Sequence, residues 1–445
     1  MSNRKHGVGR TAWMGCVVIA AATASVGGVR SARGTNTTIE VPREGALPDN
    51  ARSFWVSDSI GITIMNGPGL EFGIGGRTAP AAQLPVYESR RGRGCRHVWV
   101  RIGLDAWVCG DYGQLSQSEP NPRRYADVGG AGALPWEYVF VQRYHTHAYR
   151  TLQAALSQST NVEDFEEWEA NWGFAVREMA GGGGQRVVRS FSGYFLRRSE
   201  VYGASISNFS GAPFQDLAGG EPNIPFGWIA GYFTRVFPAP GARAATEQAE
   251  RLSRVHVYAT TELNGQQWAR IGENRWVRAD KVRFIAPEPP PELVNVGERE
   301  RWIDVDLSSQ TLLAYEGATP VYATMVSTGG ERFPTPAGVF RINSRYAHKN
   351  MDNVEARNLP NHFSFADVPF VQFFDNDRGF HGVYWHDQFG VARSHGCVNM
   401  APRDAAWLFN WTSHPLPAGW QSREIAAGQG TLVRVRGEYH GPWGR

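Results

Sequence analysis

A cysteine and two histidines near the end of the 445-residue chain have the types and spacing of an acyl-transfer site. Residues 394–400 read SHGCVNM, and a second histidine-glycine pair stands upstream at His381 and Gly382. A thiol has a free pKa of about 8.5, so at neutral pH it needs a base to become a nucleophile. A nearby imidazole can take that proton and later return it to a leaving amine. Cys397 is therefore the candidate nucleophile of a covalent acyl transfer.

Two histidines are candidates for the base that activates Cys397. His381 lies in a predicted strand over 379–384, and we expect a hairpin return to place it opposite the cysteine. We favour His381 for this reason. His395 is only two residues from Cys397, and we expect it to support or orient the pair. The alternative for His395 is a side chain that only fills the core.

Backbone groups around the cysteine are suited to a developing negative charge. Gly396 lets the main chain approach a substrate closely, and the amides of His395, Gly396 and Cys397 are the expected oxyanion site. A helix is predicted over 401–411, with Pro402 in its first turn. Its N-terminal end should lie near the thiol and favour the thiolate.

These residues belong to a predicted C-terminal domain of mostly antiparallel sheet. Alternating apolar and polar residues predict a strand over 302–307. Further strands are predicted over 312–315, 321–327, 338–342 and 431–436. A proline-rich linker at 287–298, which includes PEPPPEL, separates this domain from the upstream chain.

The motifs of this domain resemble the YkuD-type L,D-transpeptidase catalytic domain. His381-Gly382 followed by SHGCVN is similar to the signature of that family. The runs IDVDLSSQTLLAYEG (303–317), VSTGGERFPTPAGVFRI (326–342) and SHGCVNMAPRDAAWLF (394–409) are similar to its strands and helix. The resemblance covers 299–440 and implies a β-sandwich catalytic domain. Asn399 departs from the family, in which many members carry arginine there, and 343–380 resembles the family pattern less.

The resemblance implies a ping-pong reaction on peptidoglycan stem peptides, one as acyl donor and one as acceptor. Cys397 would attack the carbonyl after the third residue of a tetrapeptide stem and release D-alanine, which His381 protonates. The amine of a neighbouring stem would then resolve the thioester and form a crosslink. The Gly382 carbonyl would orient the base, and Ser394 and Asn399 would contact substrate. This chemistry needs no metal or other cofactor, and carbapenem-type β-lactams are the expected covalent inhibitors.

Three alternatives to transpeptidation are compatible with some of these residues. His381, His386, His395 and Cys397 could suggest zinc, but their spacing does not match the usual paired-ligand patterns. Water in place of the amine would make the same site an L,D-carboxypeptidase or a hydrolase that releases molecules attached to the wall, and the sequence leaves this open. A catalytically inert wall-binding scaffold is the third alternative, against which the intact His381 and Cys397 argue.

Two upstream segments share a ten-residue pattern. Residues 99–108 read WVRIGLDAWV and residues 268–277 read WARIGENRWV. Each predicts a hairpin with glycine at the turn and with tryptophan and isoleucine on one face. The pattern resembles bacterial SH3-like β-barrel modules, which we expect over 55–119 and 226–286. Their tryptophans either form barrel core or bind the glycan of the wall.

The region between these modules, 120–225, is predicted to be mixed α/β. Helix-like spacing occurs over 151–157 and 162–179, and strands are predicted over 186–201. The glycine run at 181–184 predicts a flexible turn, because no Lys-Ser/Thr pair follows it as in a phosphate-binding loop. The fold class expected for the whole chain is mainly β.

The first 24 residues have the features of a secretory signal. A basic start precedes an apolar stretch over 12–22 and the small residues Ala22-Thr23-Ala24. We expect export to the periplasm or cell wall, with an uncleaved membrane anchor as the alternative. The formal charge of +3 equals the three basic residues of this segment, so the rest of the chain is neutral. Nucleic acid is therefore not an indicated partner.

Cysteine usage supports the assignment of Cys397. Cys16 lies in the predicted signal, which leaves Cys95, Cys109 and Cys397 in an oxidising compartment. Cys95 and Cys109 flank one strand-rich segment and are predicted to form a disulfide. Cys397 would then be a lone free thiol, for which a catalytic role is the natural explanation.

Overall fold

The computed structural model describes residues 38–56, 61–122, 134–182, 185–217, 225–353 and 363–439. The predicted signal over 1–24 lies outside these residues. Within them the chain is mainly β, as predicted. The α-helices of the described part are α1 (Leu152–Ser157), α2 (Phe214–Leu217) and α3 (Pro402–Trp411). None of these helices has the length and apolar character needed to cross a membrane.

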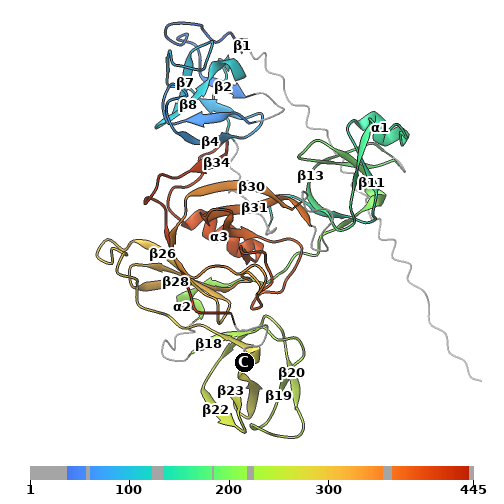
Figure 1. The fold of residues 1–445 in the computed structure, drawn as a ribbon, viewed down its shortest axis with the longest axis vertical. Coiled ribbons are helices and arrows are strands. Elements are labelled where there is room, and N and C mark those ends of the chain that lie inside the picture. Colours follow the sequence, from blue (N-terminus) through green and yellow to red (C-terminus); the bar gives the residue numbers. More distant parts are fainter. Residues whose placement is uncertain are drawn as a thin grey trace, which may run out of the picture.

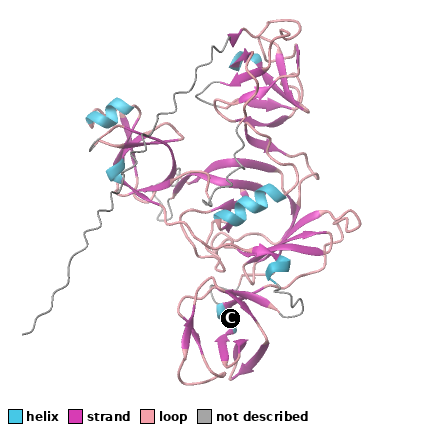
Figure 2. Cartoon of the chain, turned by 180° about the vertical axis from the view of Figure 1, so that it is seen from behind, coloured by secondary structure: helices cyan, strands magenta, loops and turns pink. Residues whose placement is uncertain are grey.

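Three small β units surround a central C-terminal unit (Figures 1 and 2). We call them the N-terminal unit (38–122), the middle unit (134–203) and the third unit (225–285). In Figure 1 the N-terminal unit lies above the C-terminal unit (286–439), the third unit below it and the middle unit beside it. The C-terminal unit therefore has a neighbour on three sides.

The N-terminal unit begins upstream of the predicted boundary at residue 55, because β1 pairs with β9 in its first sheet. Its strands are β1 (Thr38–Ile39), β2 (Ser53–Val56), β3 (Thr63–Met65), β4 (Ile74–Thr78), β5 (Gln83–Pro85), β6 (Glu88–Arg90), β7 (Trp99–Gly103), β8 (Ala106–Cys109) and β9 (Gly113–Ser116). A disulfide joins Cys95 to Cys109, with 5.6 Å between their Cα atoms.

The hairpins at the two sequence repeats form, but their tryptophan and isoleucine side chains lie on opposite faces. Trp99 packs with Trp107 and the disulfide, whereas Ile102 packs in the separate cluster that contains Val100. The predicted common face is wrong because side chains alternate along a strand, so residues three apart point in opposite directions.

The middle unit is a β structure with one short helix, not mixed α/β. Its strands are β10 (Tyr138–Val141), β11 (Thr146–Tyr149), β12 (Phe165–Trp168), β13 (Gly173–Ala180), β14 (Val187–Ser190), β15 (Phe195–Arg197) and β16 (Val201–Gly203). The helix predicted over 151–157 is α1, capped by the Thr151 hydroxyl, which accepts from the Ala154 amide. The helix predicted over 162–179 is wrong, since β12 and β13 occupy it. Gly173 to Val176 are all buried between β10 and β14, so pairing outweighs local spacing.

The middle unit contains a third copy of the repeat that the sequence pattern did not reveal. In all three upstream units a hairpin leads through one 3₁₀ turn to the closing strand; the turns are Gly110–Tyr112, Arg198–Glu200 and Ala279–Lys281. The hairpin registers correspond without gaps: Trp99 pairs with Cys109, Val187 with Arg197, and Trp268 with Arg278. The middle copy was missed because valine and phenylalanine replace its two tryptophans.

The third unit follows the same plan. Its strands are β18 (Phe226–Ile229), β19 (Thr234–Val236), β20 (Glu247–Ala249), β21 (Arg254–His256), β22 (Ala259–Leu263), β23 (Gln266–Gly272), β24 (Arg275–Arg278) and β25 (Val282–Phe284). Ile229, Val236 and Ile271 belong to its core.

The C-terminal unit contains two sheets that share one core with α3. The first sheet has the order β17-β28-β27-β26-β35-β29, in which β17 is Ala212–Pro213, and the second contains β34-β30-β31-β32-β33. The strands are β26 (Arg301–Asp306), β27 (Thr311–Glu316), β28 (Thr319–Met325), β29 (Gly338–Arg341), β30 (Ser344–Asp352), β31 (Ser364–Asp375), β32 (Arg378–Gly382), β33 (Val398–Met400), β34 (Trp420–Glu424) and β35 (Leu432–Arg436). Ile303 and Val433 of the first sheet, Phe380 and Val398 of the second, and Leu408 of α3 are buried in the same cluster.

The upstream units are joined to this core by strand pairing. Strand β17 (Ala212–Pro213) pairs with β28, so part of the region predicted as intervening completes the first C-terminal sheet. Strand β4 pairs with β34, and Gly173 forms a parallel bridge with Phe365 of β31. The C-terminal unit is therefore braced by residues far upstream of the predicted boundary at 299.

Candidate active site

The two predicted catalytic residues are carried by neighbouring parallel strands. His381 of β32 pairs with Asn399 of β33, and Phe380 pairs with Val398. The predicted hairpin return is wrong: parallel strands need a crossover connection, and residues 383–397 supply it. Cys397 is the last residue of that crossover and immediately precedes β33, which brings it to the side of β32.

The Cys397 thiol is the free cysteine of the described chain and is partly exposed. Its sulfur donates to the Asp377 carbonyl at 3.5 Å. Burial raises the pKa of Cys397 to about 11, against a smaller opposite effect of a hydrogen bond from the Gly379 backbone. The resting cysteine is therefore a neutral thiol.

The His381 imidazole is almost fully buried, with 2% of its surface exposed. Its Nδ1 lies 3.3 Å from the Gly382 carbonyl oxygen. Since a carbonyl only accepts, Nδ1 carries the proton and Nε2 is left as the basic nitrogen. Burial lowers the pKa of His381 to about 4, although the Gly382 hydrogen bond acts in the opposite direction. At neutral pH the ring is uncharged and able to accept a proton.

The loop before the cysteine is held by its own hydrogen bonds. The Ser394 hydroxyl donates to the Cys397 carbonyl and accepts from the Gly396 amide at 3.1 Å. Thr335 Oγ1 donates to the Gly396 carbonyl at 2.9 Å. The Ser394 hydroxyl, predicted to contact substrate, thus makes its hydrogen bonds within the loop. The Gly396 amide is also engaged, which leaves the amides of His395 and Cys397 as the remaining oxyanion candidates.

Gly396 has a positive φ of 116°, which favours glycine over residues with a side chain. A Cβ atom at this position would lie 3.1 Å from Nε of Arg378. Both restrictions explain why glycine stands directly before the cysteine.

The ring contacts of His395 among the described residues are with two phenylalanines and not with the catalytic pair. This histidine is exposed and lies between the rings of Phe333 and Phe363, with centroids 4.7 Å and 4.9 Å away. Partial desolvation of the ring lowers its pKa, and the charge of Arg332 acts in the same direction. His395 is therefore part of an aromatic group on the surface; it neither fills the core nor orients the catalytic pair.

A pair formed by the buried Asn399 and the half-buried His386 takes the position beside His381. Asn399 is 4% exposed, and its side-chain amide lies 3.0 Å from Nε2 of His386. Nδ1 of His386 accepts from the Gln388 amide at 3.1 Å. Burial lowers the pKa of His386 to about 3, so the ring is neutral and its proton lies on Nε2. The atom of Asn399 that lies 3.0 Å from Nε2 is Nδ2, so a hydrogen bond donated by Nε2 requires the amide to be turned by 180°, with Oδ1 facing the ring.

This pairing corrects two expectations. Asn399 was predicted to contact substrate, but its side chain is engaged by His386. From the sequence, His386 is a candidate only as a zinc ligand, because its contact with Asn399 depends on the parallel pairing of β32 and β33. Within the described residues, the ligand atoms of His381, His386, His395 and Cys397 do not form a group of three within 4.8 Å.

Helix α3 supports the strand that carries His381. Ala405, Leu408 and Phe409 of α3 share the core cluster with Phe380 of β32. The helix begins at Pro402, after the three residues of β33, and its first residue lies against Gly382, the neighbour of His381. Its first turn contains the buried Asp404, which accepts from the Gly211 amide and the Tyr322 hydroxyl.

A buried cation stabilises the other end of α3. Arg345 has no exposed surface, and its Nη1 donates to the carbonyls of Ser413 and His414 at 2.9 Å and 2.7 Å. Nη2 donates to the Phe409 carbonyl, and the guanidinium lies 4.3 Å from the Phe409 ring centroid. A positive charge at a helix C-terminus is favoured by the helix dipole.

Comparison with known proteins agrees with the resemblance seen in the C-terminal domain. Residues 300–435 match the family model of the YkuD L,D-transpeptidase catalytic domain. This match confirms the family resemblance of that part of the chain. The SH3-like character of the upstream units stays a prediction. A comparison with curated proteins found no match.

Several solved structures are similar. A cysteine-to-serine mutant of an Enterococcus faecium L,D-transpeptidase is 22% identical, with 31% of this chain and 50% of that chain covered and a TM-score of 0.24. The NMR structure of the catalytic domain from E. faecium L,D-transpeptidase acylated by ertapenem is 24% identical, with 31% and 98% covered and a TM-score of 0.23. An L,D-transpeptidase from Mycobacterium smegmatis is 15% identical, with 59% and 98% covered and a TM-score of 0.26. The chain spans half the length of the first of these structures.

Proposed function

We propose that the protein is a peptidoglycan L,D-transpeptidase in which Cys397 is the nucleophile and His381 the general base. The observation that carries the proposal is the pairing of β32 with β33, which brings a buried imidazole with a free Nε2 beside the strand that follows the free cysteine. The match of residues 300–435 to the L,D-transpeptidase catalytic domain supports the same reaction.

In the first half-reaction the sulfur turns from the Asp377 carbonyl toward His381. It attacks the carbonyl after the third residue of a donor stem; the S–C bond forms and the amide C–N bond breaks. The thiol proton passes to Nε2 of His381 and then to the amine of the leaving D-alanine. The amides of His395 and Cys397 stabilise the oxyanion.

In the second half-reaction an amine of the acceptor stem attacks the thioester. The C–N bond forms, the C–S bond breaks, and the proton released by the nitrogen returns through His381 to the sulfur. Because Nδ1 stays bonded to the Gly382 carbonyl, Nε2 is the basic nitrogen of His381 in both steps.

Both groups are neutral before the reaction. The pKa of Cys397 is raised to about 11 and that of His381 is lowered to about 4, so a preformed thiolate-imidazolium pair is strongly disfavoured. Proton transfer therefore accompanies attack. Because oxidation proceeds through the thiolate, a neutral Cys397 is less readily oxidised in an extracellular compartment.

We place the site of action outside the cytoplasm, in the periplasm or cell wall, where the proposed substrate is found. The upstream units are proposed to bind wall glycan. Burial of Trp99, Trp107 and Trp268 makes these tryptophans core residues, whereas Trp276 is half-buried and is the repeat tryptophan that a glycan could contact.

The test is incubation of the purified protein with a disaccharide-tetrapeptide, followed by mass spectrometry. A dimer formed with loss of one D-alanine supports transpeptidation. Formation of tripeptide without dimer would show that the protein is a carboxypeptidase instead of a transpeptidase. Unchanged substrate together with no carbapenem adduct would overturn the proposal in favour of an inert scaffold.

A further inference from the structure

The geometry points to a cavity beside His381 as the binding site of the acyl acceptor, selected as a positively charged amine. This inference rests on the proposed function and adds to it the side from which the second substrate enters. Three separate segments of the chain build the cavity, and only one of them belongs to the domain that carries the catalytic pair.

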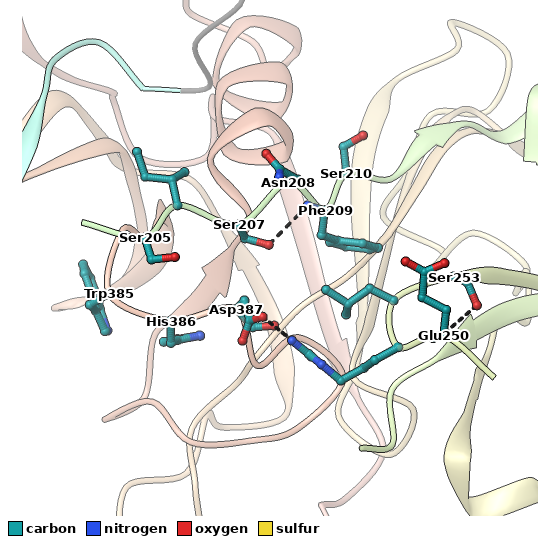
Figure 3. Close-up of a pocket in the computed structure, with 13 residues that line it drawn as sticks. Ser205, Ser207, Asn208, Phe209, Ser210, Glu250, Ser253, Trp385, His386 and Asp387 are labelled. Atoms are coloured by element: carbon teal, nitrogen blue, oxygen red, sulfur yellow. Dashed lines mark hydrogen bonds and ion pairs between the residues drawn. The ribbon is translucent and has the colours of Figure 1, made fainter. Parts of the chain in front are cut away.

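The cavity has a volume of about 790 Å³. Figure 3 shows Trp385, His386 and Asp387 on one side of it, and Glu250 and Ser253 of the third unit on the other. The connecting segment 205–210 runs between them. The cavity is thus completed by a loop of an upstream unit.

The cavity adjoins the catalytic base. The Trp385 ring lies 5.8 Å from the His381 ring, centroid to centroid. His386 lines the cavity and contacts Asn399, the strand neighbour of His381. A ligand here therefore lies on the histidine side of the site, where an incoming amine must lose its proton.

The charge of the cavity is negative. Arg251 and Asp387 neutralise each other, because Arg251 donates to both the carboxylate and the backbone carbonyl of Asp387. Arg251 also lies 4.5 Å from the Tyr232 ring centroid. His386 is neutral, since its pKa is lowered to about 3. Glu250 is exposed and takes part in no ion pair among the described residues, so its carboxylate is the one uncompensated charge of this lining.

A second cavity, of about 490 Å³, lies along the nucleophile loop and has the opposite character. Arg332 and Arg393 line it together with Glu331, Ser394 and His395. The Arg393 guanidinium is bonded to the neutral Gln388, so its charge is not cancelled there. This positive cavity suits the terminal carboxylate of the donor stem.

The two cavities therefore suit two different charged groups of the stems. The donor, whose leaving group ends in a carboxylate, lies on the positive side next to Cys397. The attacking amine of the acceptor stem is protonated in solution, and a negatively charged cavity raises the local concentration of such a group. After it gives up its excess proton to solvent, the neutral nitrogen attacks the thioester as described above, and His381 takes the proton released on bond formation.

The experiment compares Glu250→Gln with the matched control Glu262→Gln. Glu262 lies on β22, is exposed, is absent from both cavities and accepts from Gln267. Acylation by a tetrapeptide donor and transfer to an amine-bearing tripeptide acceptor are measured separately. We expect Glu250→Gln to keep the acylation rate within about twofold and to lower kcat/KM for the acceptor about fivefold, with more hydrolysed donor. Glu262→Gln should change neither.

The dependence of the acceptor KM on salt concentration is a second measurement, which distinguishes a lost charge interaction from a loss of folding. Acceptor KM of the native protein should rise with ionic strength, and this dependence should weaken in Glu250→Gln. Equal acceptor kinetics and equal salt dependence in the two variants would overturn the inference while leaving the proposed function intact. Absence of any acyl-enzyme in the native protein would overturn the proposed function and the inference with it.

Discussion

His381 and Asn399 are direct neighbours on parallel strands, and Asn399 in turn contacts His386 at 3.0 Å. The Asn399-His386 pair thus lies beside the base, at the position where many members of the similar family carry arginine. It adds no charge next to His381, so the base stays neutral and ready to accept a proton.

The first prediction concerns the nucleophile. Cys397→Ala should lower acyl transfer by at least about a thousandfold, because no other thiol of the described chain is free to replace it. Intact mass after incubation with a carbapenem should show an adduct on the native protein and none on the variant. The thermal midpoint should move little, since the residue is only partly buried. An adduct on Cys397→Ala would contradict the assignment.

The second prediction concerns pH. His381 must be neutral to accept a proton, and its folded-state pKa is lowered to about 4. The rate of acylation should therefore stay constant as pH falls from about 8 to about 5 and should decline only around pH 4. The measurement is the second-order rate of carbapenem acylation against pH. A decline centred near the ordinary histidine pKa, about 6.5, would show that the base is more exposed than the structure has it.

The third prediction separates His386 from His395. His386→Phe removes the hydrogen bond to Asn399 and leaves a buried amide without its partner, so acylation should slow about tenfold. His395→Phe is the matched control: it keeps an aromatic ring between Phe333 and Phe363 and should slow acylation less than about twofold. Acylation rates of both variants decide between them. A larger effect of His395→Phe would restore the supporting role first expected from the sequence.

The fourth prediction uses the buried carboxyl group of Asp404. Burial raises its pKa to about 6, so the folded state prefers the protonated form. Its stabilising effect is complete below the unfolded pKa of 3.8 and is lost as pH rises through 6. Asp404→Asn should remove this loss, which corresponds to about 3 kcal/mol. Urea unfolding of both proteins at about pH 4 and pH 7 tests it; an equal change in the two proteins would exclude Asp404 as the source.

The fifth prediction concerns Arg345. Arg345→Met keeps much of the side-chain volume but leaves the carbonyls at the end of α3 without donors, which should lower the free energy of unfolding by about 3 kcal/mol. Arg423→Met is the control, because Arg423 makes one exposed hydrogen bond to the Pro415 carbonyl. Urea unfolding measures both. Equal losses would mean that the buried guanidinium contributes no more than the more exposed one.

Local patterns predicted much of the C-terminal unit. The strands over 302–307 and 312–315, the helix over 401–411 and the hairpins at the two repeats were predicted from alternation, turn residues and Pro402, all of which act over a few residues. Local patterns did not identify the strands over 162–179, where continuous burial of Gly173 to Val176 in β13 removed the alternation that identifies a strand. They also missed the third repeat, whose tryptophans are replaced.

The order of amino acids alone established which groups are available for chemistry: one free thiol, a histidine followed by glycine, and a glycine directly before the cysteine. The folded arrangement settled how these groups meet. The parallel pairing of β32 and β33, the link from Asn399 to His386 and the third-unit loop that closes the cavity all join residues distant in the chain. Such contacts depend on packing between whole elements, and no local pattern encodes them.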